Sequence, residues 1–380
     1  MGLYPLEDEQ VAIRDMARGF ADERMAPHAL AWEEAAELPL DVLREAAALG
    51  MAAIYVDAES GGSGLSRLDA ALIFEALSTG CPTVAAFLSI HNMVAWVIDR
   101  YGSDAQRQAW LPSLCGMERI ASYCLTEPGA GSDAAALTTS ARRDGGDYVL
   151  NGVKQFISGA GTSDLYLVMA RTGGEGAAGV SSFLVEKGTP GLSFGANERK
   201  MGWKAQPTRQ VILEDCRVPA ENRIGDEGIG FKIAMAGLDG GRLNIGACSL
   251  GGASAALERT LAYMRERKAF GRSLDGFQAL QFRLADMATE LEAARVMLYA
   301  AAAAFDRGEP DRTQLCAMAK RLATDTGFKV ANEALQLHGG YGYLAEYGVE
   351  KIVRDLRVHQ ILEGTNEIMR LIVARGLVGR

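Results

Sequence analysis

The chain has 380 residues, of which 48% are hydrophobic and 23% charged, which is enough for a large core and for two or three domains. Its formal net charge of −9 argues against a nucleic-acid partner, because phosphate binding needs clustered lysine and arginine. No apolar run reaches the roughly 18 residues of a membrane span, so we expect no membrane partner either.

Residues 1–118 form the first predicted domain, which is helical. Strong helix formers, namely Ala, Leu, Glu, Arg and Met, dominate this stretch. Breaks occur at Pro27, Pro39 and Pro82 and around Gly61 and Gly102. Between the breaks, apolar residues recur at helical spacing. We therefore predict an N-terminal domain made of several helices.

Residues 119–225 form the second predicted domain, which is built of β-strands. Short alternating runs at 148–150, 165–170 and 182–185 are typical of strands. The sequence Asp-Gly-Gly-Asp at 144–147 is typical of a tight turn between two strands. We predict a central β domain of roughly a hundred residues, which is within the usual domain range.

Residues 226–380 return to helical patterning and form the third predicted domain. Apolar residues from Leu280 to Leu298 advance by three or four positions, which indicates one buried helix face. Further helices are predicted at about 311–337, at about 345–358 and after Thr365. The chain is therefore predicted to be mainly α with a central β domain and a C-terminal four-helix bundle.

Cysteine and histidine give no sign of a metal site. The six cysteines include no Cys-x-x-Cys pair, and none stands near a histidine at the spacing of metal ligands. The four histidines are isolated from one another in the sequence. We expect buried, reduced thiols and no bound metal.

Two stretches near the start of the β domain could hold a flat cofactor. YCLTEPGAGSD at 123–133 offers glycines for close backbone approach, with hydroxyl and N–H donors for a flavin edge or phosphate oxygens. On its glycines alone, it is more typical of an ordinary connector. FIS at 156–158 places an aromatic ring before a hydroxyl, a pattern that in isolation is more typical of core packing.

Two later stretches combine charge with glycine at predicted helix ends. RKAFGR at 267–272 either ends a helix with a common glycine cap or places the Arg267 guanidinium on a pyrophosphate. QLHGGYGY at 336–343 has more glycines than a plain helix stop needs, so it could turn against a cofactor. The residue patterns leave both alternatives open.

The last stretch is HQILEGTNEI at 359–368. Glu363 follows an apolar pair, Gly364 permits a turn, and Thr365 can cap the next helix. A carboxylate in apolar surroundings has a raised pKa, which suits a general base. The alternative is a surface acid near a helix N-terminus.

In sequence, order and spacing, these five stretches resemble the acyl-CoA dehydrogenase family from end to end. The Tyr-x-x-Thr-Glu-Pro-Gly-Ala-Gly-Ser-Asp loop and the Glu-Gly-Thr-Asn element are both highly specific. The resemblance implies a helical N-terminal domain, a β-barrel-like middle domain and a C-terminal four-helix bundle. It also implies one FAD per subunit in a homotetramer, a dimer of dimers in which each FAD is bound partly by a neighbouring subunit.

The resemblance implies roles for individual residues. The stretches that match those around the flavin ring supply Tyr123, Leu125, Thr126, Gly131, Ser132, Phe156, Ile157 and Ser158. The positions that match contacts to a neighbour's FAD are Arg267, Phe270, Phe277, Gln278, Gln336, Gly339 and Gly340. Those that match contacts to the subunit's own FAD are Thr365 and Glu367. The matches to substrate contacts, mostly with the CoA moiety, are Ser132, Asp239, Arg242, Gly364 and Arg375.

The resemblance also implies which acid is the base. Isovaleryl and long-chain members carry a glutamate directly before the arginine of an Asp-x-x-Arg motif, where this chain has Gly241. Short-chain, medium-chain and isobutyryl members carry the acid of the Glu-Gly-Thr element, which is Glu363 here. Glu363 would remove the α-proton of an acyl-CoA while FAD accepts a hydride from the β-carbon. The electrons would then pass to electron-transfer flavoprotein.

Further matches narrow the resemblance to isobutyryl-CoA dehydrogenases, at 62–69, 89–93, 187–194 and 359–367. Leu362 stands where straight-chain members usually have tyrosine, so the cavity could accept a branch at the α-carbon. Asp239 departs from the asparagine of the isobutyryl pattern but agrees with the wider family. The implied reaction converts isobutyryl-CoA to methacrylyl-CoA in valine catabolism.

Several alternatives remain open at this point. Butyryl-CoA or 2-methylbutyryl-CoA could be the substrate, and oxygen could be the electron acceptor. A nitroalkane-oxidase-like activity usually has an aspartate base, so Glu363 argues against it, and the intact base also argues against a non-catalytic flavin-binding member. Residues 1–10 resemble neither a secretory signal nor a transit peptide. We expect a bacterial cytoplasmic protein, or a mitochondrial matrix protein if a presequence has been removed.

Overall fold

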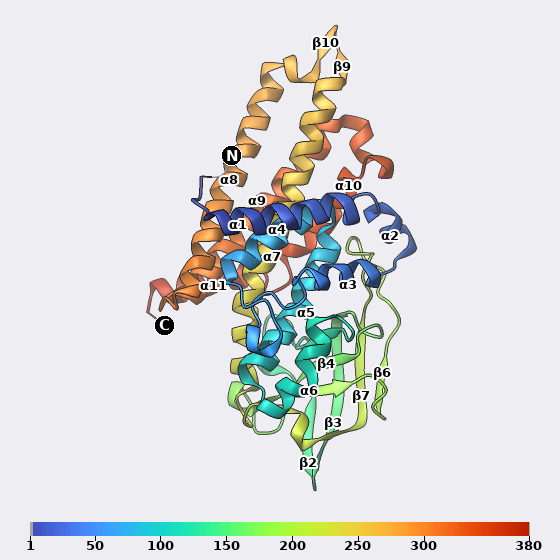
Figure 1. The fold of residues 1–380 in the computed structure, drawn as a ribbon, viewed down its shortest axis with the longest axis vertical. Helices are drawn as coiled ribbons and strands as arrows, with labels where there is room; N and C mark the ends of the chain where they lie inside the picture. Colours follow the sequence, from blue (N-terminus) through green and yellow to red (C-terminus); the bar gives the residue numbers. More distant parts are fainter. Residues whose placement is uncertain (1–2, 380) are drawn as a thin grey trace.

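The computed structural model describes residues 3–379, and Figure 1 shows how their three regions are arranged. N-terminal helices lie across the middle of the molecule, and the strands form its lower end. The long C-terminal helices run from the level of the sheet to the opposite tip. The mainly α class with a central β region is therefore confirmed.

The N-terminal region is helical, as predicted. Its helices are α1 (Asp8–Phe20), α2 (Ala29–Ala35), α3 (Leu40–Ala48), α4 (Arg67–Gly80), α5 (Pro82–Tyr101) and α6 (Asp104–Cys115). Several predicted breaks fall at their ends, since Pro39 precedes α3, Pro82 opens α5 and Gly102 follows it. Every residue of α4 is buried, so this helix lies at the centre of the helical core.

The middle region is a mixed sheet. Its strands are β1 (Ala121–Cys124), β2 (Ser140–Asp144), β3 (Asp147–Ser158), β4 (Leu165–Arg171), β5 (Val180–Glu186), β6 (Leu192–Phe194), β7 (Thr208–Pro219) and β8 (Arg223–Ile224). The strand order is β6-β7-β3-β2-β4-β5-β8, with β1 parallel to β4. The predicted Asp144–Asp147 turn joins β2 to β3. The β3–β7 register shifts between Lys154 and Ile157, and such an irregularity re-aims the side chains beside it.

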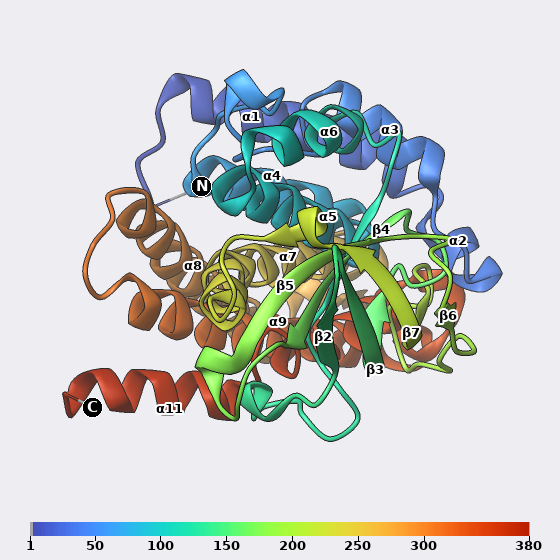
Figure 2. The same cartoon turned by 90° about the horizontal axis from the view of Figure 1, so that it is seen from below.

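The C-terminal region consists mainly of long helices. They are α7 (Gly230–Glu266), α8 (Gln278–Asp306), α9 (Arg312–His338), α10 (Val349–Arg357) and α11 (Asn366–Leu377). Helix α9 contacts α7, α8 and α11, and α7 also packs against α4 and α5. A short hairpin of β9 (Lys268–Ala269) and β10 (Arg272–Ser273) forms the tip of the molecule, and α11 extends to one side (Figures 1 and 2).

Glycine lets α7 approach the core closely. A Cβ atom on Gly251 would lie 2.0 Å from the carbonyl oxygen of Glu75 on α4, so only glycine fits there.

Secondary structure changes from helix to strand between Cys115 and Ala121 and back to helix at Gly230. The domain boundaries at 118 and 225 stay predictions.

None of the helices within residues 3–379 is both long and apolar enough to cross a membrane. The six cysteines are free thiols, and only Cys115 is partly exposed. Across the same described range, no group of three or more His, Cys, Asp or Glu side chains is placed to hold a metal ion.

Candidate active site

A cavity of about 660 Å³ lies where β1, β3, α5, α7 and the segment after α10 meet. This volume is within the usual range of small-molecule sites. The cavity brings together eleven of the residues predicted from the sequence, which come from both the β region and the C-terminal helices. They are Tyr123, Leu125, Thr126, Gly131, Ser132, Phe156, Ile157, Ser158, Arg242, Glu363 and Gly364.

Strained backbone is concentrated around this cavity. Among residues 3–379, seven non-glycine residues have positive φ, and three of them line the cavity: Phe156 at 59°, Trp203 at 54° and Glu363 at 56°. Such conformations cost on the order of 1–3 kcal/mol each and persist only where the surrounding structure enforces them. The concentration of strain therefore marks this cavity as a functional site.

Glu363 presents an unpaired carboxylate oxygen inside the cavity. The residue is partly exposed because it lines the cavity wall, but its Oε2 is buried and has no hydrogen-bond partner among the described residues. Burial raises the pKa of Glu363 to about 7, against the opposing effects of the Arg242 and Lys320 charges. A carboxyl group with this pKa can accept a proton near neutral pH, which suits a general base.

Gly241 makes room for this carboxylate. A Cβ atom at position 241 would lie 2.5 Å from the Glu363 Oε2, closer than a side chain allows. The two positions that relatives use for the base therefore face each other across one small space. An acid at 363 is compatible with glycine at 241, and a larger residue at 241 would displace it.

Arg242 contacts the backbone of the base, and Asp239 holds Arg242. The Arg242 Nε donates to the carbonyl oxygen of Glu363 at 3.3 Å, and Nη1 donates to Asp239 Oδ1 at 2.5 Å. The other oxygen of Asp239 accepts a hydrogen bond from the Thr313 hydroxyl at 2.7 Å. Asp239 itself does not line the cavity; the structure ties it to Arg242, and its contact with substrate stays a prediction.

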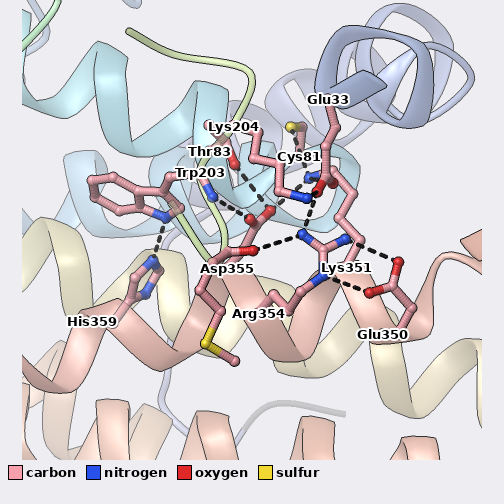
Figure 3. Close-up of polar contacts among 11 residues, drawn as sticks. Glu33, Cys81, Thr83, Trp203, Lys204, Glu350, Lys351, Arg354, Asp355 and His359 are labelled. Atoms are coloured by element: carbon pink, nitrogen blue, oxygen red, sulfur yellow. Dashed lines mark hydrogen bonds and ion pairs between the residues drawn. The ribbon is translucent and has the colours of Figure 1, made fainter. Parts of the chain in front are cut away.

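Trp203 was not predicted as a site residue, yet it lines the cavity and is held by two hydrogen bonds to C-terminal residues. Its backbone N–H donates to Asp355 Oδ1 at 2.7 Å, and its indole N–H donates to His359 Nε2 at 3.2 Å (Figure 3). Because His359 Nε2 accepts, the neutral ring carries its proton on Nδ1, which lies 2.6 Å from the Ser249 hydroxyl oxygen. Burial lowers the pKa of His359 to about 3, so the ring stays neutral.

The predicted contacts to a neighbour's FAD gather elsewhere, near the tip of α7 and α8. Arg267, Gln336, Gly339 and Gly340 line a second cavity of about 440 Å³, and none of its lining residues also lines the first cavity. The tip lies at the opposite end of the molecule from the sheet (Figure 1). Within one chain, these residues and the flavin-ring residues thus line separate cavities, as expected if a second subunit completes each cofactor site.

The aromatic residues predicted for the same contact lie in the hairpin at this tip. The rings of Phe270 and Phe277 lie 6.3 Å apart, and Phe270 is 96% exposed with φ at 51°. Gln278 is the first residue of α8. An exposed aromatic ring held in a strained conformation is typical of a contact surface.

Three further predicted contacts, at the start or in the body of α11, also line neither cavity. The Thr365 hydroxyl accepts from the backbone N–H of Ile368 at 3.3 Å, which caps α11. Glu367 and Arg375 are exposed, in the first and the last turn of that helix. Any contact they make with FAD or CoA stays a prediction.

The first cavity fits a flavin. Phe156 lines the cavity and is 64% exposed, so its ring could cover a flat cofactor, and Thr126 and Ser158, which carry hydroxyls, also line the cavity. A Cβ atom on Gly131 would meet no other atom within 4 Å, so open space adjoins that loop. Residues and space together are those that an isoalloxazine ring needs.

Family models match nearly the whole chain. The N-terminal domain of acyl-CoA dehydrogenase matches residues 7–118, its middle domain residues 122–216 and its C-terminal domain residues 228–378. The chain therefore belongs to the acyl-CoA dehydrogenase family and is an oxidoreductase with FAD as its cofactor.

Individual relatives show which members of the family this chain is similar to. The chain is 55% identical to isobutyryl-CoA dehydrogenase, mitochondrial, of Bos taurus and 56% identical to the protein of that name from Dictyostelium discoideum. Each comparison covers 98% of this chain and 90% of the relative. The structure of butyryl-CoA dehydrogenase from Megasphaera elsdenii has a TM-score of 0.95 and 38% identity, and the comparison covers 99% of both chains.

Proposed function

We propose that this protein dehydrogenates isobutyryl-CoA between its α- and β-carbons, with Glu363 as the base and methacrylyl-CoA as the product. The observation that carries this proposal is the Oε2 of Glu363, which has no hydrogen-bond partner within residues 3–379 and is buried in a cavity that fits a flavin. Structural acids in a protein interior are normally paired, so an unpaired one points to chemistry.

Glu363 would accept the α-proton of the thioester. Its pKa of about 7 makes the ionised form available at neutral pH. Arg242, from α7, holds the Glu363 carbonyl oxygen and so helps to orient the residue. The Glu363 N–H would polarise the thioester carbonyl at the point where negative charge develops.

FAD, when bound, supplies the chemistry of accepting a hydride from the β-carbon. The residues we propose to hold its ring are those of the first cavity, above all Tyr123, Thr126, Phe156 and Ser158. Arg267, Gln336, Gly339 and Gly340 of a neighbouring copy would hold the rest. This arrangement requires an oligomer, and we propose the homotetramer, a dimer of dimers.

The branched substrate fits the cavity wall around the base. Leu362 lines the cavity next to Glu363, and Gly241 leaves room for the Glu363 carboxylate. Because straight-chain members usually carry tyrosine at the position of Leu362, a leucine there would leave room for a methyl branch at the α-carbon. The names of the Bos taurus and Dictyostelium discoideum relatives support the same substrate.

Electron-transfer flavoprotein is the acceptor that we propose, because the family resemblance implies it and a solved structure 40% identical to this chain is described as an electron transferring flavoprotein of Acidaminococcus fermentans. The two isobutyryl relatives are named as mitochondrial proteins, which supports the matrix as one possible location, with the bacterial cytoplasm as the other.

Anaerobic stopped-flow reduction of the flavin with isobutyryl-, 2-methylbutyryl- and n-butyryl-CoA tests the proposal. We expect the fastest reduction with isobutyryl-CoA, and at least about a hundred-fold slower reduction in Glu363→Gln, because a positioned base contributes that much. Glu363→Gln keeps size and polarity, so it should still bind FAD and acyl-CoA. Parent-like reduction by Glu363→Gln would place the base elsewhere, and faster reduction by n-butyryl-CoA would contradict the substrate.

A further inference from the structure

Lys320 is a buried cation next to the proposed base, and no sequence motif pointed to it. It lies on α9, and its side chain is fully buried. Its ammonium group donates to the carbonyl oxygen of Gly364 and to Asn366 Oδ1, both at 2.9 Å. Neither of these partners carries a charge. Burying an ammonium without a paired carboxylate is costly, so it calls for a reason beyond packing.

The turn that Lys320 holds is the one that presents the base. Glu363 and Gly364 both have positive φ, at 56° and 89°. The carbonyl oxygen of Glu363 is held by Arg242 at 3.3 Å, and the next one along the chain is held by Lys320. Two cations from two helices, α7 and α9, therefore fix two consecutive peptide groups of a strained turn (Figure 1 places α7 beside α9).

The same face of α9 also holds the beginning of α11. The amide nitrogen of Asn366 donates to Asp325 Oδ1 at 2.7 Å and to the Thr324 hydroxyl at 3.0 Å. Gln360, on the other side of the turn, donates to Asp325 at 2.8 Å. Lys320 and Thr324 are four positions apart and therefore share one helix face, and Asp325 is the next residue along the helix. Together the three residues hold the segment 360–366.

We propose that Lys320 is a positioning residue for Glu363: it holds the 363–366 turn in place, and its charge favours the ionised form of the carboxylate that abstracts the proton. This inference rests on the proposed role of Glu363 as the base. It assigns to Lys320 a function in the reaction although its hydrogen bonds go to a carbonyl and an amide and to no group of the substrate.

Charged groups from each packed element surround Lys320. Glu363 comes from the turn, Arg242 from α7, Asp325 from α9 itself and Glu367 from α11. Burial lowers the pKa of Lys320 to about 8, while attraction to Glu363 opposes this effect. The ammonium is thus largely charged at neutral pH, and it holds down a Glu363 pKa that burial raises. Tyr123 and Tyr55 also lie near Glu363, but burial raises the pKa of each, so both stay neutral.

Lys320→Met tests this inference in the FAD-loaded enzyme, because it keeps length and apolar volume and removes charge and donors. The pH dependence of flavin reduction by isobutyryl-CoA is the deciding measurement. The rate of flavin reduction is expected to rise with pH as Glu363 ionises. Loss of a neighbouring positive charge should move this rise about one pH unit higher, which makes reduction roughly ten-fold slower at acid pH. Lys329→Met is the matched control on the same helix, because Lys329 is exposed and pairs with Glu290.

A second readout follows the base without measuring turnover. The protonated carboxyl band of Glu363 in infrared spectra, assigned by its absence in Glu363→Gln, should vanish about one pH unit higher in Lys320→Met than in the parent. Lys320→Gln removes the charge and keeps a donor, so it should show the same shift with a more stable turn. It also decides the question if Lys320→Met does not fold.

The inference would be overturned if the Lys320 variants showed the same pH dependence of the reduction rate and the same carboxyl titration as the parent. A slower reduction at every pH without a shift would also overturn it, because a merely structural lysine would have that effect. Either result leaves the proposed function intact as long as Glu363→Gln is inactive. Activity of Glu363→Gln, by contrast, would refute the proposed base whatever Lys320 does.

Discussion

Two buried groups of charges lie near the cavity, and they are built in opposite ways. In the first, Asp355 accepts hydrogen bonds from Lys351 at 2.5 Å, from the Thr83 hydroxyl at 2.9 Å and from the Trp203 N–H at 2.7 Å (Figure 3). In the second, one oxygen of Glu363 has no partner among the described residues. The first group joins all three regions of the chain, and the second opens into the cavity.

The pKa values follow this difference. Burial would raise the pKa of Asp355, but Lys351 and the other donors lower it, so the carboxylate stays ionised. Burial raises the pKa of Glu363 to about 7, because Arg242 and Lys320 offset only part of the desolvation. Pairing thus turns a buried acid into a structural support, and the lack of pairing leaves one able to take up a proton.

The largest effect is expected in the paired group, from Lys351→Met. This change leaves Asp355 buried without its cation, and breaking a buried pair costs about 3–5 kcal/mol. Urea unfolding of the holoenzyme should show that loss. Lys329→Met, at an exposed pair, should cost no more than about 1 kcal/mol. Equal stability of the two variants would mean that the Asp355 group does not support the fold.

Gly241→Ala tests whether the unpaired group depends on free space. The new methyl group would lie 2.5 Å from Glu363 Oε2, so the carboxylate has to move. A displacement of about 1 Å costs on the order of a hundred-fold in rate, and we expect flavin reduction to slow by that much while FAD is retained.

Gly237→Ala is the control for that change. It lies one turn earlier on α7, and its methyl group would meet Met93 at an ordinary 3.5 Å. We expect parent-like reduction from it. If Gly241→Ala is as active as Gly237→Ala, the base does not sit against α7.

Much of the difference between the Asp355 group and the Glu363 group could not be predicted from the sequence. The regular elements could, because the 144–147 hairpin turn and the ends of α5, α9 and α11 depend on local residues. The eleven cavity residues were named from the motifs that carry the family resemblance. The contact of Asp239 with Arg242 was not predicted, and its substrate contact stays a prediction.

Lys320 and Trp203 were missed for a physical reason. Each reaches the site through the packing of distant segments, since Lys320 lies 44 residues from Gly364 and Trp203 lies 156 from His359. One signal was available, because Lys320 interrupts an otherwise small and apolar face at helical spacing from Cys316 and Thr324. A lone lysine on a buried face is a candidate for a functional contact.

The smallest effect is expected from Leu362→Tyr, which should change selectivity and leave the base in place. A ring beside the α-carbon would crowd the methyl branch and leave room for n-butyryl-CoA. One methyl group is worth roughly 1–3 kcal/mol in an apolar pocket, so the preference for isobutyryl-CoA should fall by about ten-fold or more. An unchanged ratio of reduction rates with the two substrates would show that Leu362 does not select the branch.

The pH dependence of single-turnover flavin reduction by isobutyryl-CoA tests the central claim most directly. A base acts in its ionised form, so the rate should rise about ten-fold per pH unit in acid. It should level off above the Glu363 pKa of about 7, and Glu363→Gln should show only slow reduction without this limb. A flat profile in the parent, or the same limb at the same rate in Glu363→Gln, would contradict the assignment of Glu363 as the base.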